Sequence, residues 1–301
     1  MSLIRQWDTD WFDQFKKIIA TNLTTLNIYP GEPLWWLERR DVAFGEKQIQ
    51  PQVRRPDQRV HVSRDVEYYD KYADRIVQVA DMPSITDSLR IDEEYYAGDV
   101  VNAVGHVSDL FENFKDGLAQ FIYVGTASNP LAYGLLDYPN GTAGTLVRPE
   151  QVAPVTTAGA WTTPGNMMSD IAKMEAGLID KNFHGEKLLL APSRLRPYLS
   201  SVLTSTTTPY SYWISSIGGY PIVFSEWVDA DATEDAFDIY MVDRNSFDLF
   251  STPMSVRGFF DNNTEDFVWH WKTRAYLLAR PKHDGTEWLK GQVKCTVDWN
   301  S

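Results

Sequence analysis

The sequence predicts a mixed α+β fold with an extended arm near its beginning, and three observations lead to this prediction. Apolar residues recur every three or four positions between Asp99 and Gln120, which indicates a long amphipathic helix. The last third of the chain contains runs rich in aromatic and β-branched residues, which are typical of strands. Residues 42–74 are charged and poor in apolar runs, and prolines at 51 and 56 interrupt them. They therefore fit an extended two-stranded loop better than a packed core.

Composition narrows the class of protein. A chain of 301 residues can form one large domain or two ordinary ones. Its 11 Trp, 15 Tyr and 14 Phe fit either a large core or a subunit with extensive contacts. The net charge of -13 argues against a polymerase, repressor or nuclease, because phosphate binding depends on clustered Lys and Arg. It does not exclude a container for DNA.

The N-terminal segment predicts a helix and no targeting signal. Residues 7–20 present one apolar face that includes Trp11, Phe15 and Ile19. Met1–Ala20 lacks the apolar core and the cleavage site of a signal peptide. No apolar run is long enough to span a bilayer, so we expect no membrane partner.

The remaining elements follow in order. The helix ending at Gln120 would be about 30 Å long if it has about twenty residues. Thr163-Pro164 predicts the start of a second helix, because Thr can cap a helix and Pro suits its first turn. After that helix we expect a short buried strand at Lys187–Leu190, a helix at Arg194–Leu203, and strands at Ile217–Trp227, Phe237–Val242 and Phe267–Ala279.

No pattern predicts a catalytic, cofactor-binding or metal-binding site. The five histidines lack the spacing of a helical zinc motif, and a single cysteine, Cys295, excludes a cysteine zinc cluster and an intrachain disulfide. Gly141–Thr145 lacks the lysine of a phosphate-binding loop. Asp229–Asp235 lacks the glycine and glutamate that a calcium-hand loop requires, so a solvated acidic loop is the better interpretation.

The densest positive cluster lies in the proposed extended loop and consists of Arg54, Arg55, Arg59 and Arg64. Acidic residues interleave with it, so the simplest interpretation is a solvated strand face. The functional interpretation is charge pairing with an adjacent subunit. Nucleic-acid binding ranks third, because no aromatic stacking platform accompanies the arginines.

Three segments carry a resemblance to a known family: Phe121–Leu136 after the long helix, Lys187–Pro192, and Ile217–Ser225. Their order resembles the Hong Kong 97-type major capsid proteins of tailed phages, a fold that encapsulin shell proteins share. The resemblance covers the chain best from Asp99 onward. It implies the following parts: an N-terminal arm (1–41), an extended β loop (42–74), a peripheral domain (75–164) with a spine helix (99–120), an axial domain (165–266), and a return strand with a C-terminal tail (267–301).

The resemblance implies a structural function without an enzyme activity or cofactor. Many copies would form pentamers and hexamers of an icosahedral virion shell around double-stranded DNA, without sequence-specific binding. The virus would be a tailed phage or an archaeal virus, assembled in the host cytoplasm, with minor capsid, portal or scaffolding proteins as further partners. A polar axial loop would lie at the symmetry axes and consists of Ser205, Thr206, Thr207, Thr208 and Pro209.

Two alternatives remain open. The first is an encapsulin nanocompartment that encloses cargo enzymes, since the amphipathic helix around Trp11–Ile19 also resembles the encapsulin helix that docks cargo peptides. The second is a soluble enzyme or binding domain with an unrecognised site.

Overall fold

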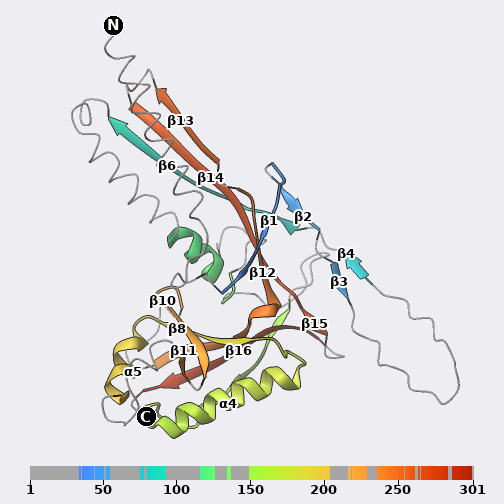
Figure 1. Cartoon of the computed structure of the whole chain (residues 1–301), viewed down its shortest axis with the longest axis vertical. Coiled ribbons are helices and arrows are strands. Elements are labelled where there is room, and N and C mark those ends of the chain that lie inside the picture. Colours follow the sequence, from blue (N-terminus) through green and yellow to red (C-terminus); the bar gives the residue numbers. More distant parts are fainter. Residues whose placement is uncertain are drawn as a thin grey trace, which may run out of the picture.

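The computed structural model has a mixed α+β architecture, which confirms the predicted fold class (Figure 1). It describes residues 34, 36–43, 45–50, 52–54, 75–77, 80–92, 116–125, 134–136, 149–203, 216–217, 219–228, 236–253, 255–261, 264, 266–283 and 287–299. Within these ranges, two large sheets and two two-stranded ribbons account for the strands.

The seven-stranded sheet forms the centre of the body shown at the bottom of Figure 1. Its strands run in the order β15-β16-β11-β8-β10-β9, and β7 pairs with β16. The β8–β10 and β7–β16 pairs are parallel and the others antiparallel. The bounds are β7 Glu150–Val155, β8 Lys187–Pro192, β9 Ser216–Ile217, β10 Tyr220–Ser225, β11 Ala236–Asp243, β15 Lys282–His283 and β16 Trp288–Asp298.

Helices α4 (Pro164–Asp180) and α5 (Leu195–Leu203) bury apolar side chains against one face of this sheet. The buried stripe of α4 contains Met167, Ile171, Met174 and Leu178, which is the stripe that the sequence predicts. Pro164 starts α4 as expected, whereas the Thr163 side chain makes no capping hydrogen bond.

A buried carboxylate fixes the chain that leads into α4. Asp170 is fully buried and accepts hydrogen bonds from the Trp161 indole (3.0 Å), the Thr157 hydroxyl (2.8 Å) and the Ala158 amide (2.7 Å). These donors satisfy a charge that would otherwise be costly to bury, so the segment is held against the helix.

The second core lies on the other face of the seven-stranded sheet. There Leu188 and Leu190 of β8 pack with Trp36, with the helix formed by residues 116–124, and with the second sheet. Because both faces of β8 are covered, all six of its residues are buried.

The five-stranded sheet contains β1 (Glu38–Asp41), β6 (Ser84–Asp92), β12 (Phe247–Ser251), β13 (Ser255–Asp261) and β14 (Asp266–Ala279), and a 3-10 turn at Arg244–Ser246 precedes β12. The C-terminal part of β14 pairs with β12, which also pairs in parallel with β1. The N-terminal part of β14 lies between β6 and β13, and these three strands extend away from the body (Figure 1).

The ends of the proposed extended loop form an antiparallel ribbon. β2 (Gln48–Ile49) pairs with β5 (Ala80–Asp81), and β3 (Gln52–Arg54) pairs with β4 (Arg75–Val77). Residues 55–74, including the alternating segment at 59–63, lie outside the described residues. The ribbon is the geometry expected at the base of an extended two-stranded loop.

The structure differs from the sequence expectations in the bounds of the long helix and in several strands that the sequence did not predict, among them β1, β7, β12 and β13. The long helix continues to residue 124 rather than ending at Gln120, and its expected first part, residues 99–115, lies outside the described residues. The sequence also predicted no strand for β16, which lies inside the seven-stranded sheet. The domain boundaries at 41, 74, 164 and 266 stay predictions.

Candidate functional site

The predicted assembly residues fall mostly outside the described part of the chain. Arg54 ends β3, directly opposite Arg75 of β4. Arg55, Arg59 and Arg64 lie outside the described residues, as does the predicted axial loop, residues 205–209. The roles of both sets therefore stay predictions.

The segment that carries the family resemblance forms a joint at the end of the long helix. Gly125 adopts a φ of 75°, which favours glycine at a helix C-terminus, and its amide donates to the Phe121 carbonyl. The chain then returns, and the amides of Leu135 and Leu136 donate to the carbonyls of Ile122 (2.8 Å) and Tyr123 (2.9 Å). These bonds satisfy carbonyls that a helix end leaves without partners.

Buried polar groups attach this joint to the seven-stranded sheet and to the chain before β1. The Lys290 ammonium of β16, 2% exposed, donates to the Leu135 carbonyl at 3.0 Å. The Trp36 indole donates to the Tyr123 hydroxyl at 3.2 Å, and burial raises the pKa of that hydroxyl. The joint thus connects the long helix, the chain before β1 and the seven-stranded sheet.

A charge network attaches β1 to β12 and to the residue that follows β14. The buried Asp248 carboxylate of β12 accepts two bonds from the Arg280 guanidinium, at 2.5 and 2.6 Å. Arg40 of β1 reaches the same carboxylate at 3.2 Å. A fork-like pair on a buried carboxylate is among the stronger polar contacts, so β1 is fixed in position as well as paired.

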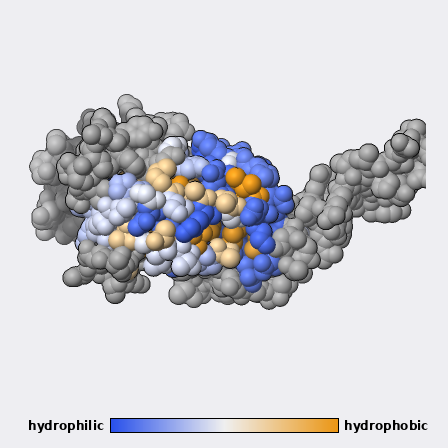
Figure 2. Space-filling model, turned by 90° about the horizontal axis from the view of Figure 1, so that it is seen from below, coloured by the Kyte–Doolittle hydropathy of each residue, from blue (hydrophilic) through white to orange (hydrophobic). Residues whose placement is uncertain are grey.

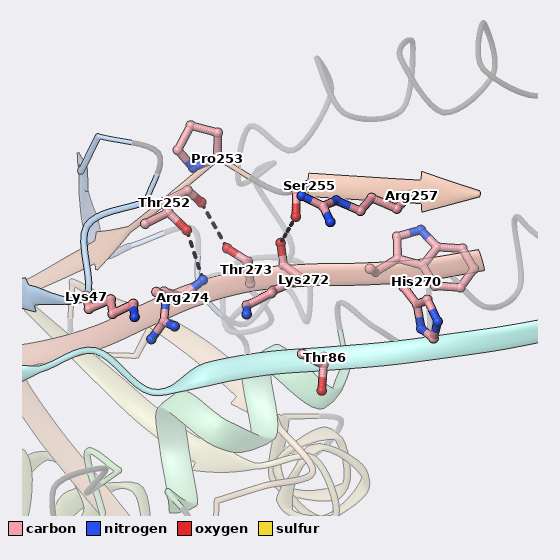
Figure 3. Close-up of a pocket in the computed structure, with 12 residues that line it drawn as sticks. Lys47, Thr86, Thr252, Pro253, Ser255, Arg257, His270, Lys272, Thr273 and Arg274 are labelled. Carbon is pink, nitrogen blue, oxygen red and sulfur yellow. Dashed lines mark hydrogen bonds between the residues drawn. The ribbon is translucent and has the colours of Figure 1, made fainter. Parts of the chain in front are cut away.

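Positive side chains gather along a groove beside β14, which we call the basic groove (Figure 3). Its volume is about 590 Å³, and it is lined by Lys47, Arg257, His270, Lys272 and Arg274 together with uncharged residues. These side chains come from the loop before β2 and from β13 and β14. Sequence reasoning missed the groove because only strand pairing brings residues 47, 257 and 272 together.

The outer surface of α4 is a second exposed feature. Met168 and Ile179 are each 41% exposed there. Figure 2, which views the molecule from below, shows hydrophobic groups scattered among hydrophilic ones rather than one continuous apolar patch. Scattered apolar residues of this kind are normal on a protein surface.

The described ranges bear on metal binding and on membrane spans. No group of three or more His, Cys, Asp or Glu side chains there is arranged to hold a metal ion. Among the helices of the same ranges, none is both long and apolar enough to cross a membrane.

The fold defines the class: this chain has the Hong Kong 97-type capsid fold, as its sequence predicted. It is similar to the capsid of a native GTA particle, with 10% identity, 90% and 91% coverage of the two chains and a TM-score of 0.59. It is similar to a structure of Microbacterium phage Oxtober96, with 12% identity, 90% and 93% coverage and a TM-score of 0.64.

A third similar structure belongs to a different kind of shell. The holo-SrpI encapsulin complex from Synechococcus elongatus matches with 14% identity, 91% and 90% coverage and a TM-score of 0.55. No protein-family model matches this chain. No curated protein matches it in sequence.

Proposed function

We propose that this protein is a major capsid protein whose copies self-assemble into an icosahedral virion shell around double-stranded DNA. The observation that carries the proposal is that the likeness to the GTA capsid extends over 90% of this chain and 91% of the other. A likeness of that extent involves the entire capsid plan rather than one common substructure. A fold by itself does not determine function, so the proposal needs a test of assembly.

The functional parts follow from this proposal. Residues 205–209 form a loop without charges at the fivefold and sixfold axes, where each charge would be repeated at close range. The arginines at 54, 55, 59 and 64 pair with carboxylates of a neighbouring subunit. The shell forms in the host cytoplasm and becomes part of the virion, with minor capsid, portal or scaffolding proteins as additional partners. The protein has no enzyme activity.

The second candidate is an encapsulin shell that encloses cargo enzymes. The encapsulin likeness favours it, since that structure covers 91% of this chain at a TM-score of 0.55. The capsid is preferred because the Oxtober96 structure matches with the higher TM-score of 0.64, and because a long extended loop suits strong contacts between subunits.

Electron microscopy of the recombinant protein, combined with sedimentation, tests the proposal. Closed shells of uniform size are expected. A monodisperse protein of subunit mass under every assembly condition would refute both shell functions. In particles recovered from the native source, packaged genomic DNA supports the capsid, whereas a co-purifying enzyme supports the encapsulin.

A further inference from the structure

The strand register explains why the basic groove concentrates positive charge. Along β14, His270, Lys272 and Arg274 occupy alternate positions and therefore share one face of the sheet. Arg257 of β13 lies directly opposite His270, and Lys272 lies opposite Thr86 of β6. Lys47 reaches the same opening from the loop before β2 (Figure 3).

Among the residues that the structure describes, no carboxylate balances this charge. The groove is lined by neither Asp nor Glu, and within the described ranges Lys47, Arg257, Lys272 and Arg274 form no ion pair. Arg274 donates to the neutral Met82 carbonyl at 2.8 Å. Lys47, Arg257 and Lys272 are exposed. Neighbouring like charges on a sheet repel one another, so the isolated subunit carries an electrostatic penalty here.

Other arginines of the same structure do have carboxylate partners. Arg280 and Arg40 reach Asp248 at 2.5 and 3.2 Å, and Arg244 reaches Glu186 at 2.7 Å. The basic groove differs from these sites, because its cations have no carboxylate partner in the described part of the chain.

We propose that the basic groove binds Asp and Glu side chains of a second copy of this chain when the shell assembles. This proposal rests on the proposed shell function. The chain carries 41 acidic against 28 basic residues, so a second copy is a rich source of carboxylates. In a shell, many copies lie at high local concentration. Charge complementarity then steers one copy onto the next and penalises wrong contacts.

Trp271 lies between His270 and Lys272 on β14, so its side chain lies on the opposite face of the sheet from theirs. Trp271 lines the cavity and is 2% exposed, and its indole N–H has no acceptor in the described structure. The indole N–H therefore points away from Lys272 and Arg274, and the proposal depends on the charges of the groove alone.

Nucleic acid fits the groove less well than a second copy does. The net charge of -13 repels nucleic acid and a second copy alike, so the difference between them lies in what the groove offers to bases. Trp271 is buried, so it offers no exposed stacking platform for bases. Phosphate binding is therefore an outcome that the experiment has to separate from the proposal.

The test compares Lys272→Glu with Arg196→Glu. Arg196 is an exposed cation of α5 outside the groove, so the control makes the same change of net charge. Particle yield is measured by sedimentation at matched subunit concentration. Lys272→Glu should lower the yield about tenfold or more, whereas Arg196→Glu should leave it near wild type. The melting temperature of the isolated Lys272→Glu subunit should not fall, because the change relieves repulsion between neighbouring cations. If the melting temperature does fall, the test uses Lys272→Gln instead. That variant removes the charge without reversing it, so it should lower the particle yield by a smaller factor than Lys272→Glu.

Zero-length carbodiimide crosslinking of wild-type particles identifies the occupant directly. Particles assembled from mixed ¹⁴N- and ¹⁵N-labelled subunits should contain mixed-isotope crosslinks from Lys47 or Lys272 to an Asp or Glu. A normal yield of Lys272→Glu particles without such crosslinks would overturn the proposal. So would normal particles of this variant with a reduced nucleic-acid content, which would assign the groove to phosphate. If wild-type subunits form no particles at all, the proposed function itself fails, and that result is distinct from a failure of the groove.

Discussion

At the scale of single residues, the Cys295 thiol reports on the integrity of the main core. Its side chain is fully buried among apolar residues of β16 and α4, and burial raises its pKa to about 12. The reactive thiolate therefore does not form in the native subunit near neutral pH. We expect labelling by a thiol reagent at pH 8 to be about 100-fold or more slower in the native than in the denatured protein.

The same shift gives a pH dependence of stability. The unfolded thiol ionises above its ordinary value of about 9, whereas the folded one stays neutral up to about 12. The contribution of the buried Cys295 thiol to the free energy of unfolding is thus fully present below pH 9 and is lost as the pH rises toward 12. Urea unfolding of wild type and Cys295→Ala across this range checks the sign, since the variant should lose stability less steeply. If the free energy of unfolding falls equally steeply with pH in both proteins, the result would contradict burial of the thiol.

Asp116 and Glu226 form an unfavourable pair of exposed carboxylates. The charge of Asp116 raises the pKa of Glu226, while Asp116 also accepts a hydrogen bond from the Trp227 indole at 3.1 Å. The repulsion is present above the raised pKa and disappears as the pH falls below the ordinary value of about 4.3. Glu226→Gln should therefore stabilise the subunit at pH 7 by a few tenths of a kcal/mol, and not below pH 4.

The matched control for this prediction is Glu186→Gln. Glu186 pairs with Arg244 at 2.7 Å, so its neutralisation should destabilise the subunit slightly at pH 7. Urea unfolding of both variants at the two pH values provides the measurement. A change of the same sign in both variants at pH 7 would rule out the local pairs as the cause.

At the scale of elements, the joint at residues 121–136 depends on a close approach of two backbones. A Cβ atom on Gly134 would lie 2.3 Å from the Tyr123 carbonyl oxygen and 2.4 Å from the Gly125 nitrogen. Backbone atoms cannot move aside as a flexible side chain can. Gly134→Ala should therefore cost about 2–3 kcal/mol of the free energy of unfolding.

Gly117, in the helix that ends at residue 124, is the matched control. A Cβ there would meet no atom within 4 Å, so Gly117→Ala should stabilise the protein by up to about 1 kcal/mol through helix propensity. Thermal unfolding of the two variants should shift in opposite directions. Melting temperatures that shift in the same direction in both variants would contradict the close approach of the two backbones at Gly134.

The same elements show what could be predicted from the sequence. The α4 helix was predicted because its buried stripe from Met167 to Leu178 follows a local period. The β16 strand was missed because Lys290, Gly291 and Gln292 interrupt its apolar pattern, although all three are buried. Gly291 is required by a distant contact, since a Cβ there would lie 2.2 Å from the Ser246 hydroxyl. Such requirements, like the basic groove, depend on contacts between segments that the sequence does not show as neighbours.

At the scale of the whole molecule, the extended loop should serve assembly rather than folding. Arg54 and Arg75 form the last described pair of the β3–β4 ribbon, so the sequence between them can be replaced by a two-residue Asn-Gly turn that suits an antiparallel ribbon. Closing a loop of two rather than twenty residues costs roughly 2 kcal/mol less. The shortened subunit should therefore melt at the same or a higher temperature than wild type.

Shell formation should respond in the opposite direction, because residues 55–74 carry three of the four arginines proposed to contact a neighbouring subunit. Particle yield at matched concentration should fall about tenfold or more. A second variant, in which a Gly/Ser linker of the natural length replaces residues 55–74, separates side-chain contacts from loop length and should also assemble poorly. Sedimentation and electron microscopy measure assembly, and thermal unfolding measures the subunit. A normal yield of shells from the Asn-Gly variant would mean that the loop does not hold neighbouring subunits together. A large fall in the melting temperature of this variant would mean that the loop belongs to the fold of the subunit itself.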